Sequence, residues 1–138
     1  MKIVVIDGQG GQLGAGLVKE IIARFPECSL TVIGTNSVAT AAMIKAGAKK
    51  GATGENPVRV AALSADVIIG PIGIVIADSM LGEITPDMAV AVGRSSAVRI
   101  LVPMNRCDSL IAGVENQNMA SLIDDAMKKL AAIKDSAI

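Results

Sequence analysis

The fold is decided by residues 2–14, which read KIVVIDGQGGQLG. The run ahead of Asp7 is apolar, rich in β-branched side chains and of strand length. A glycine-rich turn follows, and apolar residues then recur at helical spacing from Leu13 to Phe25, where a proline ends the pattern. This stretch therefore predicts a strand, a tight turn and a helix in immediate succession.

The same alternation continues along the chain. Further strands are predicted at 30–33, 66–70 and 98–102, with a weak one inside 47–54, and further helices at 37–46, 56–63, 85–93 and 119–130. Ser37 and Asn56 are the expected N-caps of two of these helices. Residues 74–81 fit either a helix or irregular core.

Strands that are apolar on both faces and alternate with helices are typical of a parallel sheet covered on each side. We therefore predict one Rossmann-like α/β domain over residues 1–138, a three-layer sandwich with a mostly parallel sheet of five to six strands. A short strand is also expected at 109–112. The loop before it is too short for a crossover, so this strand should pair antiparallel as a hairpin edge.

Composition excludes several classes of protein. The 138 residues carry 13 Lys plus Arg and 13 Asp plus Glu, a net charge of +0, which argues against nucleic acid as a partner. The share of hydrophobic residues, 51%, excludes disorder. The central uncharged run, 67–77, is too short to span a membrane. Lys2 opens directly into a strand, so no signal peptide is expected, and the protein should be soluble and cytoplasmic without a membrane partner.

Missing residue types narrow the chemistry further. The chain has no His, Tyr or Trp and a single Phe. Imidazole catalysis, His-ligated metals, tyrosine–lysine chemistry and aromatic platforms for nucleobases are therefore excluded. We expect no metal, and the catalytic residues, if there are any, stay unknown.

The glycine-rich turn is the strongest indication of a binding site. Its spacing is Gly-x-x-Gly-x-x-Gly at Gly8, Gly11 and Gly14, directly before a helix whose free amides can hold a phosphate. The predicted contacts in this turn are Asp7, Gly8, Gln9, Gly10, Gly11, Gln12 and Gly14. Alternatively, the glycines only pack the helix against the strand. Asp7 would repel a pyrophosphate unless a metal intervened. Alternatively, Asp7 only accepts hydrogen bonds from the loop amides.

Two further segments should lie at the same edge of the sheet. Thr35 and Asn36 follow the second strand and can hydrogen-bond a ribose or a 2′-phosphate, although no acid stands there to take a 2′-hydroxyl. The turn at Gly70, Pro71 and Gly73 should face the glycine-rich turn across the topological switch point, as a ligand contact or as a plain turn.

The loop after the strand at 98–102 adds Asn105 and Arg106, and Arg106 can hold a carboxylate or phosphate. Cys107 beside it is a candidate reactive thiol or only a small buried side chain. Glu55 is a second candidate for chemistry, with a plain helix start as the alternative. The apolar helices around Ser79 to Val92 suggest a homodimer.

Four segments resemble a known family: IDGQGG at 6–11, GATGEN at 51–56, GPIGI at 70–74 and NRC at 105–107. They are similar to a family of short bacterial proteins catalogued as a domain of unknown function. The resemblance covers nearly the whole chain and implies a Rossmann-like domain, with no activity to carry over.

Three hypotheses of function follow. The first is binding of a nucleotide or dinucleotide, NAD(P) or similar, through the Gly8–Gly14 turn. The alternative is a non-enzymatic small-anion sensor or interaction module that acts as a homodimer. The third is a reductase-like enzyme that uses Cys107 or Glu55.

Overall fold

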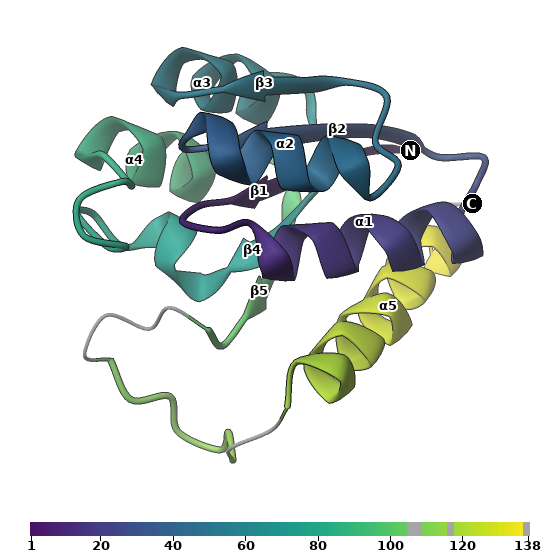
Figure 1. Ribbon diagram of the computed structural model, residues 1–138. Coiled ribbons are helices and arrows are strands. Elements are labelled where there is room, and N and C mark those ends of the chain that lie inside the picture. The colour runs from purple at the N-terminus through teal and green to yellow at the C-terminus, as the bar shows by residue number, and fades with distance from the viewer. Residues whose placement is uncertain (105–108, 116–117, 137–138) are drawn as a thin grey trace.

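The strands pair in the order β3-β2-β1-β4-β5, and every pairing is parallel, in a computed structural model of the chain (Figure 1). The structure describes residues 1–104, 109–115 and 118–136. The strands are β1 (Lys2–Asp7), β2 (Ser29–Gly34), β3 (Gly51–Thr53), β4 (Val67–Pro71) and β5 (Val98–Val102). The chain builds outward from β1 to β3 and then crosses back to β4 beside β1, which confirms the predicted switch point.

Helices cover both faces of the sheet. One face carries α1 (Gln12–Arg24), α2 (Ser37–Lys45) and α5 (Met119–Ser136), and the other carries α3 (Glu55–Ser64), the short 3₁₀ helix η1 (Ile72–Val75) and α4 (Pro86–Arg94). Alternate side chains of β1 enter the two cores, Ile3 and Val5 on the first face and Val4 and Ile6 on the second. The predicted three-layer α/β fold is confirmed.

The predicted hairpin edge is wrong. Residues 109–112 form no strand, and the five described strands are all parallel. Leu110 is 95% exposed, so this short apolar run has no face to bury against the sheet. No strand follows β5 among the described residues; the next element is α5, which packs back on α1 and β5.

Helix starts also differ from the prediction. The side chain that caps α2 is Asn36, which accepts from the Ala39 amide, and not Ser37. α3 begins at Glu55 after Gly54, which places Asn56 inside the first turn. Both differences are shifts of one or two residues within correctly predicted helices.

The ambiguous segment before α4 is mostly turns. After η1, residues 77–83 form turns in which Asp78, Met80, Leu81 and Gly82 all have positive φ. Three of these four are not glycine, so the conformation is held by packing and hydrogen bonds rather than by local preference. The helix predicted at 85–93 is confirmed as α4, and the ambiguous residues 74–81 form the end of η1 and turns rather than an α-helix.

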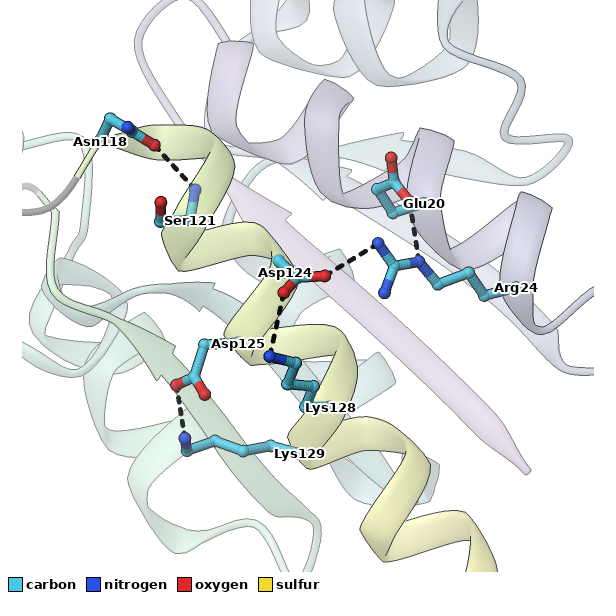
Figure 2. A network of polar contacts seen from close by, with 8 residues as sticks. All are labelled: Glu20, Arg24, Asn118, Ser121, Asp124, Asp125, Lys128 and Lys129. Atoms are coloured by element: carbon cyan, nitrogen blue, oxygen red, sulfur yellow. Dashed lines mark hydrogen bonds and ion pairs between the residues drawn. The ribbon is translucent and has the colours of Figure 1, made fainter.

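The last helix is fastened to the first by buried apolar side chains and a chain of exposed ion pairs (Figure 2). Arg24 on α1 contacts Glu20 at 2.9 Å and Asp124 on α5 at 3.1 Å. These side chains are all more than 40% exposed, so the pairs orient α5 more than they stabilise it. Among the described helices, none is both long and apolar enough to cross a membrane.

Candidate functional site

The turn between β1 and α1 is shaped by close packing at most of its glycines. Gly11 is the N-cap of α1 with φ of 73°, and a Cβ there would lie 2.8 Å from the Cα of Ala39 on α2. A Cβ on Gly14 would lie 2.6 Å from the sulfur of Met43. Packing of helices against each other and against β1 therefore accounts for these two glycines without a ligand.

Gly10 differs from its neighbours in the turn. It is exposed, and a Cβ built on it would meet no atom within 4 Å. Within the part of the chain that the structure describes, no acceptor receives the amide of Gly10, nor those of Gln12 and Leu13 in the first turn of α1. Free amides beside an open glycine are what a phosphate or carboxylate needs in order to approach a backbone.

Asp7 closes the other side of the same turn. The residue is 2% exposed, and its carboxylate accepts from the Gly8 amide at 2.8 Å and from the Gly14 amide at 2.7 Å. The interpretation that Asp7 accepts hydrogen bonds from the loop amides is confirmed. Burial raises the pKa of Asp7, although these two hydrogen bonds act to lower it. Asp7 thus accepts a hydrogen bond from one amide in the first turn of α1, that of Gly14, and leaves the amides of Gln12 and Leu13 without this acceptor.

A second carboxylate, missed from the sequence, joins the two predicted loops. Glu83 Oε1 accepts from the Gln9 amide at 2.8 Å, from Thr35 Oγ1 at 2.6 Å and from Asn36 Nδ2 at 2.7 Å. Its other oxygen, Oε2, accepts no hydrogen bond from the described residues. Partial burial alone would raise the pKa of Glu83, but the three hydrogen bonds outweigh burial and lower it.

The turns before α4 hold Glu83 in place. The hydroxyl of buried Ser79 donates to the Gly73 carbonyl, and Ile84 is 1% exposed in the core. Met80 is also buried, and its sulfur lies 2.7 Å from the position that a Cβ on Gly8 would take. The absence of a side chain at Gly8 therefore leaves space for Met80. Figure 1 shows the turns before α4 at the same edge of the sheet as the loop after β1.

Nothing in the sequence near Thr35 could have revealed Glu83. The two residues are 48 positions apart, and Glu83 belongs to no recognisable motif. Only the pairing of β1 with both β2 and β4 brings the turns before α4 to the loops after β1 and β2.

The turn after β4 is buried rather than open. Gly70, Pro71 and Gly73 all lie in the interior. A Cβ on Gly70 would collide with the carbonyl oxygen of Ile6, so glycine is needed there for β4 to lie against β1. The structure brings this turn to the predicted edge, and its role as a ligand contact stays a prediction.

The remaining candidates divide into two groups. Glu55 accepts a hydrogen bond from Thr85 Oγ1 at 2.5 Å, which ties the start of α3 to the N-cap of α4 and indicates a structural role. Asn105, Arg106 and Cys107 lie outside the residues that the structure describes. In the described ranges no three His, Cys, Asp or Glu side chains gather as a metal site.

The site thus offers two chemistries side by side. Free amides of the glycine-rich turn can bind an anion, and the Glu83 carboxylate, with one oxygen unused, can accept hydrogen bonds from hydroxyl groups. Neither Asp7 nor Glu83 has a Lys or Arg partner among the described residues.

Comparison with known proteins agrees with the resemblance noted in the sequence. No curated protein matches the chain. A family model described as a domain of unknown function, DUF3842, matches residues 2–135. The match spans both cores and every strand, and the chain therefore belongs to the DUF3842 family.

Proposed function

We propose that this protein binds a nucleotide or an NAD(P)-like dinucleotide at the carboxyl edge of its sheet, through the Gly8–Gly14 turn. The observation that carries the proposal is the group of free amides at Gly10, Gln12 and Leu13 beside a glycine with open space around it. The edge lies at the switch point between β1 and β4, which is where open α/β sheets bind their ligands.

The turn suits the phosphates of such a ligand. Amide hydrogens and the positive end of the α1 dipole both favour negative charge at Gln12 and Leu13. The buried Asp7 carboxylate opposes this, because like charges repel. Its raised pKa reduces the penalty, since Asp7 takes up a proton more readily than an exposed aspartate when an anion arrives.

Gly10 allows a test that separates ligand approach from packing. Gly10→Leu fills the open space and meets no neighbouring atom at its Cβ, so the fold should remain intact while a ligand is kept from the amides. Gly11→Ala is the contrasting variant, because its Cβ would press on the backbone of Ala39. Binding of NADH, NADPH and ATP is measured for each protein by calorimetry, and stability by thermal unfolding.

The proposal requires that wild type binds at least one of these nucleotides and that Gly10→Leu weakens binding at least tenfold with an unchanged melting temperature. Gly11→Ala should instead lose stability. If wild type binds none of the three, or if Gly10→Leu binds as wild type does, the proposal is wrong. Binding of inorganic phosphate alone would favour the small-anion sensor.

Protein interaction is a second candidate function. Val60 and Leu63 on α3 and Val90 on α4 are 59%, 84% and 45% exposed, and they line one groove between these helices. Arg59, Asp87 and Arg94 line the same groove and provide charges of both signs. An apolar surface with both signs of charge can pair with a second copy of itself, which is the geometry of a twofold homodimer.

A further inference from the structure

We propose that Glu83 determines ligand specificity by selecting a nucleotide whose ribose carries a free 2′-hydroxyl and rejecting one with a 2′-phosphate. The inference rests on the proposed nucleotide site and names the ligand class within it. Its basis is the position of one carboxylate oxygen, Oε1, against donors from the loops after both β1 and β2.

The hydrogen-bond donors around Glu83 are already in use. A 2′-phosphate needs hydrogen-bond donors or cations around it. Thr35 and Asn36 are the polar side chains that follow β2, and both donate to Glu83 Oε1. The Gln9 amide, a backbone donor of the glycine-rich turn, also donates to that oxygen. The donors that a phosphate would use are therefore already occupied by a carboxylate.

The charge of Glu83 and its second carboxylate oxygen also favour a 2′-hydroxyl over a 2′-phosphate. Hydrogen bonds from Thr35, Gln9 and Asn36 favour the ionised form of Glu83, so the site carries a fixed negative charge. A phosphate beside it would be repelled. A ribose hydroxyl, in contrast, can donate to Oε2, which accepts nothing from the described residues.

Glu83 also lies where a ribose-binding acid is expected. In doubly wound sheets the acid that binds the ribose normally stands at the end of the second strand. Here that strand ends in Gly34, and none of the next three residues, 35–37, is an acid. Glu83 brings a carboxylate to the same place from the turns before α4 and is held there by its buried neighbours Met80 and Ile84.

Glu83→Gln is the decisive variant. A glutamine can place its Oε1 where the present Oε1 accepts three hydrogen bonds, so the local contacts survive. The change removes the charge and turns the free acceptor Oε2 into an NH₂ donor. The matched control is Asp78→Asn, which removes one charge from the same turns at an exposed residue with φ of 64°, a conformation that asparagine tolerates.

The experiment compares NADH with NADPH, which differ only in the 2′-phosphate, by calorimetric titration of wild type and both variants. We expect wild type and Asp78→Asn to prefer NADH, and Glu83→Gln to reduce that preference roughly tenfold or more, since the charges are adjacent. Circular dichroism shows whether each variant keeps the fold.

The other outcomes are distinguishable. If wild type binds NADPH as tightly as NADH, or if Glu83→Gln leaves the preference unchanged, the role of Glu83 is refuted while nucleotide binding stands. If wild type binds neither of these nor ATP, the nucleotide site itself is refuted, and the inference with it.

Discussion

Asp7 is the buried charge on which the glycine-rich turn depends. Asp7→Asn keeps the shape of the side chain but replaces one acceptor oxygen by an NH₂ group, which would face the amide of Gly8 or Gly14. We expect a loss of about 1–3 kcal/mol in the free energy of unfolding, because a buried donor is left without an acceptor. Urea denaturation measures it.

The control for this prediction is Asp78→Asn, an exposed acid in which the same change should cost less than about 0.5 kcal/mol. Equal stability of Asp7→Asn and wild type would mean that the two amide hydrogen bonds contribute nothing to the fold.

Glu83 makes the stability of the protein depend on pH in a defined direction. Its pKa is lower in the folded protein than its ordinary value of 4.5, so the folded state binds this proton less readily than the unfolded chain. The contribution of Glu83 is therefore complete above pH 4.5 and is lost as pH falls through the folded pKa.

Glu83→Gln should accordingly be less stable than wild type by about 1 kcal/mol at neutral pH, since three hydrogen bonds lose their charge assistance at a partly exposed group. The difference should vanish in acid, where Glu83 is also neutral. Chemical denaturation of both proteins at several pH values tests this, and a difference that grows on acidification would have the wrong sign.

The candidate site was only partly predictable at the level of single residues. Asp7, Gln9, Thr35 and Asn36 could be named because Asp7 ends a strand and the other three lie in the loops directly after strands, which the sequence pattern reveals. Glu83 could not, because its position follows from turns with positive φ at Asp78, Met80 and Leu81 that no local preference predicts.

The packing of α5 against the rest of the protein can be tested at one buried side chain. Leu130 lies on α5, has no exposed surface, and packs in the core that α1 and α5 cover. We expect Leu130→Ala to lower the free energy of unfolding by about 2–5 kcal/mol, through lost burial and the cavity left behind. Thermal or urea unfolding gives the value.

Lys128→Ala is the comparison within the same helix. Lys128 is 73% exposed and contacts only Asp124 among the ion pairs described. Its loss should hardly change the melting temperature. The Lys128–Asp124 pair shown in Figure 2 lies within α5, so its loss does not detach the helix from α1. If Leu130→Ala were as stable as wild type, burial of Leu130 would not hold α5 in place.

Secondary structure was more predictable than the path of the chain. Strands β1, β2, β4 and β5 and helices α1 and α5 followed from apolar periodicity, because each buries a continuous face. The segment 109–112 was mistaken for a strand because a short apolar run looks alike whether or not it finds a neighbour to pair with. Whether such a segment pairs with a strand depends on tertiary contacts that the local sequence does not show.

The surface of the whole molecule predicts self-association through α3 and α4. Leu63 is the most exposed of the large apolar residues that line the groove between these helices, at 84%. We expect wild type to sediment as a dimer and Leu63→Glu to sediment as a monomer with unchanged stability, because an exposed leucine contributes little to its own core. Analytical ultracentrifugation distinguishes the two.

Leu110→Glu is the matched control for this surface. Leu110 is 95% exposed but lies on the connection between β5 and α5 and is not among the residues that line the α3–α4 groove. The Leu110→Glu substitution should leave the dimer intact. Wild type that sediments as a monomer, or Leu110→Glu that dissociates the dimer while Leu63→Glu does not, would exclude the α3–α4 surface as the interface.

The central claim, a nucleotide on the amides of the glycine-rich turn, is tested most directly by following the backbone amide resonances of the ¹⁵N-labelled protein as NADH is added. We predict that the largest shifts fall on Gly10, Gln12 and Leu13, with a further shift at Gln9 beside Glu83. An unchanged spectrum with NADH, NADPH and ATP alike, or shifts confined to α3 and α4, would contradict the proposal.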